Sequence, residues 1–190
     1  MKKLMVVIGS ARENRIADNI LKQVKVQLAN FGDFEVTVAD LKNLPMPLFN
    51  APASPSSEDF RATDANVINW TRIIGETDAV LFLVAEYNHS LTAVLKNAID
   101  WIYHEWSGKP VAFVGYGWVG GARAIKHLRD IMGSTISAKA METEANLRFM
   151  KEIDLEGNIV DEEAANSAIK SVLYELGTSV RKGIPVTAEY

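Results

Sequence analysis

The chain has 190 residues, of which 48% are hydrophobic and 23% charged, a composition typical of a globular domain. Its net charge of -4 favours neither nucleic acid nor an anionic membrane as a partner, and no apolar run approaches the ~20 residues of a membrane span. Because cysteine is absent, thiolate, disulfide and cysteine-ligated cluster chemistry is excluded, and redox work would need an organic cofactor. We expect a single cytoplasmic domain over residues 1–190.

Strand-like and helix-like segments alternate along the chain. The predicted strands are, in order, Lys3–Ile8, Phe34–Ala39, Ala79–Val84, Lys109–Gly115 and a weaker one near Thr135–Ala140. The predicted helices are Ile16–Phe31, about Thr63–Gly75, Thr92–Trp106, one ending near Met132, and about Glu162–Gly183, with a proline-rich loop over Leu41–Pro55. Apolar strands separated by helices predict an α/β fold, a flavodoxin-like three-layer sandwich with a five-stranded parallel sheet in the order 2-1-3-4-5.

The loop after the first predicted strand has the chemistry of an anion site. Free backbone amides at a helix start favour an anion, and Arg12 and Arg15 offer forked donors suited to phosphate oxygens. Ser10 and Asn14 add further hydrogen-bonding groups. The spacing matches neither the dinucleotide-binding nor the nucleoside-triphosphate glycine motif, so a phosphate monoester is the better candidate. The alternative is a solvated helix start with two surface arginines.

A second polar loop, Glu86–Ser90, follows the third predicted strand. In the predicted strand order this loop faces the first one across the switch point of the sheet, where such folds hold ligands. The alternatives are that Glu86 only stabilises a helix N-terminus, that Tyr87 only packs at the core edge, and that His89 is a solvated histidine. No metal site is predicted, because no histidine has a second ligand at metal spacing, and residues 154–158 are expected to form an exposed turn.

Three motifs together resemble the NAD(P)H-dependent FMN reductase family, which includes small flavodoxin-like quinone, azo-dye and chromate reductases. The motifs are Gly9-Ser-x-Arg12-x-x-Arg15, the Glu86-Tyr-Asn-x-Ser90 loop with Leu95-Lys-Asn-Ala-Ile-Asp-Trp101, and the glycine-rich turn Gly115–Gly121. The resemblance covers roughly residues 3 to 140. It implies noncovalent FMN, NAD(P)H as electron donor, a quinone-like small-molecule acceptor, and a homodimer or homotetramer.

The resemblance also implies which residues hold the cofactor. The implied phosphate ligands are Ser10, Arg12, Arg15 and Ile16. The residues implied at the isoalloxazine ring, largely through backbone groups, are Ala85, Glu86, Tyr87, Asn88 and Gly117. No catalytic side chain is implied, because the flavin supplies the chemistry. The chain departs from the usual pattern at Ala85 and at Thr92-Ala93, where prolines are common, and this predicts looser loops; Arg15 stands where serine is frequent.

Assembly and function leave alternatives open. Trp101, Tyr103 and Trp106 fall partly outside the apolar stripe of the predicted helix, which predicts a partner surface over Leu95–Trp106. The alternative is that the turn after the fourth predicted strand, or the last predicted helix, covers these aromatic residues. For function, the rivals are a flavodoxin-like electron carrier that does not use NAD(P)H and a non-catalytic FMN-binding sensor.

Overall fold

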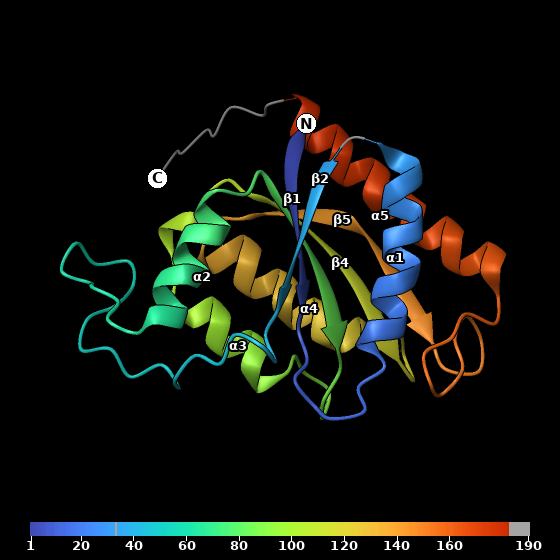
Figure 1. Ribbon diagram of the computed structural model, residues 1–190, viewed down its shortest axis with the longest axis horizontal. Helices are drawn as coiled ribbons and strands as arrows, with labels where there is room; N and C mark the ends of the chain where they lie inside the picture. The colour runs from blue at the N-terminus through green and yellow to red at the C-terminus, as the bar shows by residue number, and fades with distance from the viewer. Residues whose placement is uncertain (33, 183–190) are drawn as a thin grey trace.

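A computed structural model describes residues 1–32 and 34–182, and at its centre lies one five-stranded parallel sheet. The strand order is β2-β1-β3-β4-β5, as predicted. The strands are β1 Lys2–Ile8, β2 Phe34–Asp40, β3 Ala79–Ala85, β4 Pro110–Gly117 and β5 Lys139–Arg148. Since all strands are parallel, their carboxyl ends lie at one edge of the sheet, at the bottom of Figure 1.

Helices cover both faces of the sheet (Figure 1). One face carries α1 (Ala17–Phe31) and α5 (Glu162–Lys182); the predicted end of the last helix at Gly183 lies outside the described residues. The other face carries α2 Ala65–Gly75, α3 Ala93–Asp100 and α4 Ala122–Asp130. Among the described residues, no helix is both long and apolar enough to cross a membrane.

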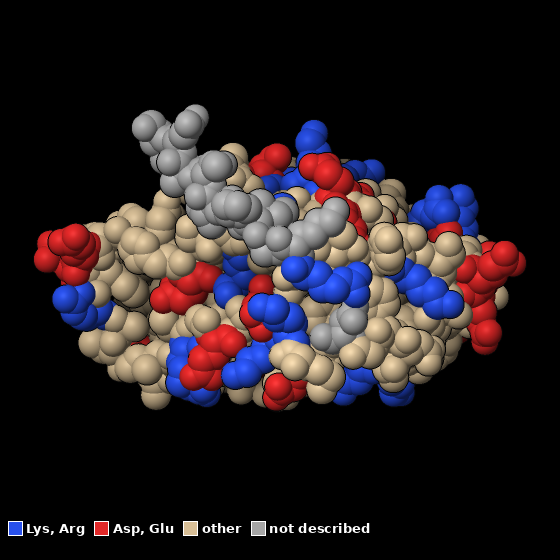
Figure 2. Space-filling model, turned by 90° about the horizontal axis from the view of Figure 1, so that it is seen from above, with Lys and Arg blue, Asp and Glu red and all other residues tan. Residues whose placement is uncertain are grey.

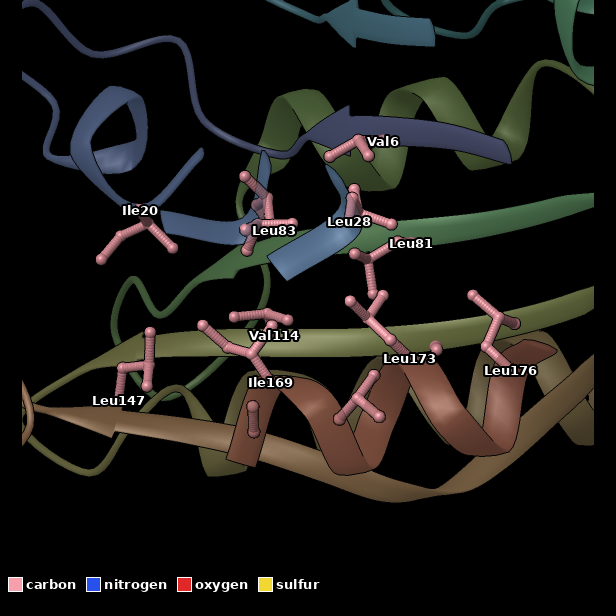
Figure 3. Packing of buried hydrophobic residues seen from close by; sticks show 14 of the residues in the cluster. Val6, Ile20, Leu28, Leu81, Leu83, Val114, Leu147, Ile169, Leu173 and Leu176 are labelled. Carbon is pink, nitrogen blue, oxygen red and sulfur yellow. The ribbon is translucent and has the colours of Figure 1, made fainter. Parts of the chain in front are cut away.

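The central strands β1, β3 and β4 are largely apolar because each face of the sheet forms its own core. Alternate residues of β1 point to opposite faces: Val6 and Ile8 lie in the core under α1 and α5, whereas Met5 and Val7 lie in the core on the other side. Figure 3 shows the first core, where the side chains of α5 pack against those of the central strands. Each fully buried aliphatic side chain contributes about 1.5–3 kcal/mol, so this packing fixes the strand ends that carry the loops.

The last strand differs from the prediction. The range Thr135–Ala140 was wrong: β5 runs from Lys139 to Arg148, and residues 131–135 form a π-helical turn that extends α4. β5 is an edge strand whose buried positions, among them Met141 and Ala145, alternate with polar ones. It therefore lacks the continuous apolar run that marks the central strands.

The helix predicted over Thr92–Trp106 is also shorter. α3 ends at Asp100, and a single 3₁₀ turn follows at residues 104–106. Where the helix ends, the Trp101 indole N–H donates to the carbonyl of Pro47 (2.7 Å) and its ring packs against Phe49 of the proline-rich loop.

The aromatic residues that predicted a partner surface are covered within the chain. Trp101 is 6% exposed and Trp106 fully buried, while Tyr103 is half-buried. Trp101 meets Phe49 of the proline-rich loop with ring centroids 5.0 Å apart, and Trp106 meets Trp70 of α2 at 6.0 Å. Neither the turn after β4 nor helix α5 provides these contacts. The partner surface over Leu95–Trp106 thus loses the observation that predicted it.

The face of the molecule at the amino ends of the strands carries both positively and negatively charged side chains. Figure 2 views this face, and the described lysines and arginines lie there among aspartates and glutamates. At the amino end of β1, Asp78 accepts hydrogen bonds from the Lys2 ammonium (3.2 Å) and the Lys3 amide (2.7 Å). Charge at this end therefore ties β1 to the start of β3.

Candidate functional site

Three loops meet at the carboxyl edge of the sheet. We call residues 9–16, after β1, the first loop; residues 86–92, after β3, the second loop; and residues 118–121, after β4, the third loop. β1, β3 and β4 are neighbours in the sheet, so the three loops lie side by side at the bottom of Figure 1. This places the two polar loops predicted from the sequence at one edge, as the strand order required.

The first and second loops are joined at Gly9. The Gly9 amide donates to the carbonyl of Leu83 (3.0 Å), and the Thr92 hydroxyl donates to the carbonyl of Gly9. A Cβ atom at Gly9 would lie 2.9 Å from both the Leu83 oxygen and the Leu95 side chain, so only glycine fits. Thr92 also caps α3, because its hydroxyl accepts from the Leu95 amide (3.2 Å). The second loop is therefore anchored, although threonine stands where proline is common.

The first loop presents backbone donors to solvent. Within the described part of the protein, the amides of residues 11–14 donate to no protein acceptor. The loop runs into α1, whose N-cap is Ile16, a residue with no side-chain group to satisfy the helix start. Unsatisfied amides and a helix N-terminus together attract an anion.

The two arginines of the first loop have different surroundings. Arg12 is exposed and has no ion pair or hydrogen bond among the described residues. The Arg15 side chain is only 7% exposed and forms a two-pronged ion pair with Asp40 at the end of β2, with both N–O distances 2.6 Å. Burial alone would raise the pKa of Asp40, but hydrogen bonds from Arg15 and from the Lys42 amide outweigh it and hold the pKa below its ordinary value.

Ser10 points into the protein. Its side chain is almost fully buried, and its Oγ lies 3.2 Å from Oη of Tyr116, a residue of β4. β3 lies between β1 and β4, and its residue paired with Tyr116 is Ala85, so a short side chain leaves room for this contact. Burial raises the pKa of Tyr116 to about 12, which keeps the phenol protonated and able to donate. The sequence analysis missed Tyr116, because it ended the fourth strand at Gly115 and placed Tyr116 in the glycine-rich turn, whereas β4 runs to Gly117.

The second loop contains a tight turn closed by its own hydrogen bonds. Tyr87 and Ser90 exchange two backbone hydrogen bonds, of 2.9 and 3.0 Å. Asn88 and His89 between them have positive φ angles of 50° and 66°, the geometry of a type I′ turn without its usual glycine. The turn fixes the backbone of Asn88 and leaves the Tyr87 side chain 38% exposed.

Polar side chains tie the second loop to α4. Glu86 accepts from the Arg123 amide (3.2 Å) and from its guanidinium (2.8 Å), so it stabilises the N-terminus of α4. Ser90 Oγ lies 3.0 Å from Nδ1 of His127. Glu86 thus has the helix-capping role that the sequence left as an alternative, but toward α4 and not toward its own helix. Arg123 and His127 were missed, because only the fold brings α4 beside this loop.

The glycines around the third loop have two separate roles. A Cβ at Gly120 would fall 2.5–2.7 Å from Asn146, and one at Gly121 would fall 2.9–3.0 Å from the backbone of Gly115 and Val84, so these glycines allow close packing. A Cβ at Gly117 would meet nothing within 4 Å, although its φ of 135° still favours glycine. Gly117 therefore faces open space.

A segment after β5 flanks the first loop. Gly157 packs against Ile16 so closely that a Cβ there would lie 2.8 Å from the Ile16 side chain, and the Asn19 amide group donates to the carbonyl of Glu156 (2.9 Å). The turn is held internally by Asp154, whose carboxylate accepts from the amides of Glu156 and Asn158. The sequence predicted this exposed turn but not its place beside α1. No three His, Asp or Glu side chains of the described residues gather as a metal site would require.

The site residues implied by the resemblance thus fall into two groups. The first loop combines unpaired amides, the free cation of Arg12 and a helix N-terminus, which suits a phosphate monoester. The second loop and Gly117 offer fixed backbone and open space, which suits the edge of a flat ring. These donors fit FMN, a flat ring carrying a terminal phosphate. A separate hollow of about 480 Å³ between residues 55–62 and α2 contains none of these residues.

Comparisons with known proteins agree with this geometry. Residues 2–150 match the family model described as NADPH-dependent FMN reductase. The chain is 34% identical over 140 residues to the NAD(P)H-dependent FMN reductase of Saccharomyces cerevisiae, covering 68% of this chain and 73% of that protein. It is 33% identical to the NADPH:quinone oxidoreductase of Arabidopsis thaliana, covering 92% of this chain and 89% of that protein.

A solved structure is similar over almost the whole chain. It is that of a flavoenzyme NAD(P)H:(acceptor) oxidoreductase from Paracoccus denitrificans, with a TM-score of 0.75, 25% sequence identity, and coverage of 96% of this chain and 98% of that one. The family match spans β1 through β5 and includes all three loops. The chain belongs to the NADPH-dependent FMN reductase family.

Proposed function

We propose that this protein is an NAD(P)H-dependent FMN oxidoreductase that transfers two electrons from NAD(P)H, through noncovalently bound FMN, to a small quinone-like acceptor. The observation that carries the proposal is the set of unpaired donors in the first loop, residues 11–14, at the edge where Gly117 leaves open space. Family membership supplies the chemistry that these donors would serve.

The residues of the three loops bind and orient in this proposal. Arg12, the amides of the first loop and the backbone at Ile16 hold the phosphate, with the hydroxyl of Ser10 beneath them. Backbone groups of the second loop, from Ala85 to Asn88, line the ring edge. FMN held there would supply the redox chemistry, as an acceptor of hydride from NAD(P)H and a donor of two electrons to the small-molecule acceptor. No side chain is assigned a proton transfer.

An exposed aromatic side chain favours the proposal that the electron acceptor is a flat molecule. Trp118, next to Gly117, is 71% exposed and rests edge-on against Phe149 with ring centroids 5.4 Å apart. An indole held beside the open space at Gly117 offers a surface on which a planar ring can stack. Two relatives are a 2-hydroxy-1,4-benzoquinone reductase from Burkholderia and the Arabidopsis quinone oxidoreductase. Quinones are therefore the acceptor class that we propose.

The test is a visible spectrum of the purified protein with added FMN, followed by anaerobic NADH or NADPH and then a benzoquinone. We expect FMN to remain with the protein through gel filtration, its absorbance near 450 nm to bleach with NAD(P)H, and the colour to return with the quinone. Protein that binds no FMN would overturn the proposal. Protein-bound FMN that NAD(P)H does not bleach would favour the electron carrier or the sensor.

We further propose that the described residues act as one FMN-binding domain, that the enzyme works in the cytoplasm and that it forms a homodimer or homotetramer. Trp101 and Trp106, two of the aromatic residues that predicted the contact surface, are buried, so the contact would have to use other residues. Light scattering on a sizing column tests the assembly directly; a monomer at micromolar concentration would contradict it.

A further inference from the structure

The two arginines of the first loop look equivalent in sequence but differ in free hydrogen-bonding capacity. A guanidinium has five N–H donors and no acceptor. Arg12 is exposed, and none of its donors has a partner among the described residues. The Arg15 side chain is buried, and each of its N–H donors has an acceptor.

All five Arg15 donors are engaged. Nε donates to Asp18 (3.2 Å), and one terminal nitrogen donates to the carbonyl of Ser10 (2.6 Å) and to Asp40 (2.6 Å). The other terminal nitrogen donates to Asp40 (2.6 Å) and to Asp18 (3.0 Å). A phosphate oxygen could bind Arg15 only by displacing one of these acceptors. Two carboxylates face this single cation, so its charge is already compensated.

The contacts of Arg15 also determine the shape of the loop. Its bond to the carbonyl of Ser10, five residues earlier, closes the first loop on itself, and Asp40 anchors the closed loop to β2. In this closed loop, the amides of residues 11–14 have no protein acceptor among the described residues. The cation that fixes the loop is thus separate from the donors that remain free.

We infer that Arg15 is a positioning residue that shapes the phosphate cradle from behind, while Arg12 alone supplies the cation that meets the FMN phosphate. The inference rests on the proposed FMN binding and corrects the role of phosphate ligand that the resemblance implied for Arg15. Ser10 acts through the same closed loop.

Asp40→Asn gives a test in which the two roles predict opposite signs. If Arg15 positions the loop, removing its anchor weakens FMN binding, and we expect the Kd to rise about fivefold to tenfold, the loss of one charge-assisted contact. If Arg15 were a phosphate ligand restrained by Asp40, the same change would free it and lower the Kd. The Kd is measured by quenching of FMN fluorescence. An unchanged or lower Kd would overturn the inference.

The matched control is Asp100→Asn, which removes the same group from the partly exposed Lys96–Asp100 pair of α3 (2.6 Å). It should leave the Kd for FMN within about twofold. Riboflavin, which has the ring and lacks the phosphate, is titrated in parallel. Its Kd should change less than about twofold in Asp40→Asn, because only the phosphate cradle is disturbed. Retained riboflavin binding also shows that the variant is folded.

Two arginine variants separate the roles even if Asp40→Asn does not fold. Arg12→Gln should raise the Kd for FMN about tenfold or more, less at high salt, with riboflavin unaffected. Arg15→Lys keeps a positive charge but loses the fork, so we expect it to weaken FMN binding and lower the thermal stability of the FMN-free protein. Arg12→Gln should not lower that stability. Arg15→Lys with wild-type affinity and stability would overturn the inference.

Failure of the inference and failure of the proposed function give different results. Wild-type protein that binds neither FMN nor riboflavin would overturn both. Wild-type protein that binds FMN, with tighter binding in Asp40→Asn, would overturn only the inference. A double variant, Asp40→Asn with Arg15→Lys, should bind FMN no worse than the weaker single variant, because both changes break one contact. Additive losses would contradict a shared role.

Discussion

The first and second loops lie side by side and are equally polar, but they meet their hydrogen-bonding needs in different ways. In the second loop the turn closes on itself, and Glu86 and Ser90 bind α4, so its polar groups are largely engaged. In the first loop Arg15 and Ser10 are engaged inside the protein, whereas the amides of residues 11–14 and Arg12 have no protein partner among the described residues.

The difference suits the two parts of the ligand that we propose for this edge of the sheet. Donors without partners attract a charged group, because a bound anion supplies acceptors that the protein lacks. A loop whose polar groups are engaged is rigid and presents a fixed backbone to a flat ring. In each loop one charged side chain, Arg15 in the first and Glu86 in the second, forms an ion pair within the protein.

The largest effect should come from breaking the junction between the loops. Gly9→Ala places a Cβ 2.9 Å from the Leu83 carbonyl oxygen, which cannot yield without moving β3. We expect a loss of about 3 kcal/mol in the free energy of unfolding, measured with urea. Gly133→Ala is the matched control, because its Cβ would meet nothing within 4 Å and the change should be neutral or slightly stabilising. Equal losses would show that Gly9 is not a special contact.

The next effect concerns the anchor of the first loop and depends on pH. Because the folded-state pKa of Asp40 is lowered, its ionised form stabilises the fold above its ordinary pKa of 3.8, and this contribution is lost as the pH falls through the folded pKa. We expect Asp40→Asn to cost about 2 kcal/mol at pH 7 and less at pH 3. Urea unfolding at both pH values measures this, and an equal cost at both would contradict the ion pair.

A smaller effect should follow from removing the hydroxyl shared by both loops. Thr92→Ala removes the cap of α3 and leaves the carbonyl of Gly9 without its buried donor, so we expect a loss of about 1–2 kcal/mol. For a protein of this size this lowers the melting temperature by roughly 2–8 °C. Thr92→Ser retains the hydroxyl and should recover most of the loss. If serine behaves like alanine, the methyl group and not the hydrogen bonds holds the loops together.

The smallest effect should come from the contact between the second loop and α4. Glu86→Ala removes two hydrogen bonds to Arg123, but this arginine is nearly half exposed, so we expect only about 1 kcal/mol. The control is Glu76→Ala, which breaks a pair with Arg72 whose side chains are both more than half exposed, and it should cost less than about 0.5 kcal/mol. Calorimetric melting of both variants measures the two losses of stability. Equal shifts would mean that Glu86 gives α4 no more support than a surface charge does.

Much of the fold could be read from local patterns. Runs such as Ala79–Val84 are apolar at every position, and only strands buried on both faces require that. Where burial is one-sided, the pattern misleads: β5 alternates polar with apolar residues because it is an edge strand, and its predicted range was displaced. Trp101 and Trp106 also misled, since no local pattern shows that a proline-rich loop and α2 would cover them.

The sequence by itself determined the α/β alternation, through hydrophobic periodicity, and the family, through short motifs; the sheet order followed from the flavodoxin-like pattern that these fit, and it placed the two polar loops at the carboxyl edge. Only the tertiary structure decided which polar side chains are free. Asp40 lies 25 residues from Arg15, Tyr116 lies 106 from Ser10, and Arg123 lies 37 from Glu86. The packing of the strands brings these distant residues into contact. It gives Arg15 its acceptors and leaves Arg12 without a partner among the described residues.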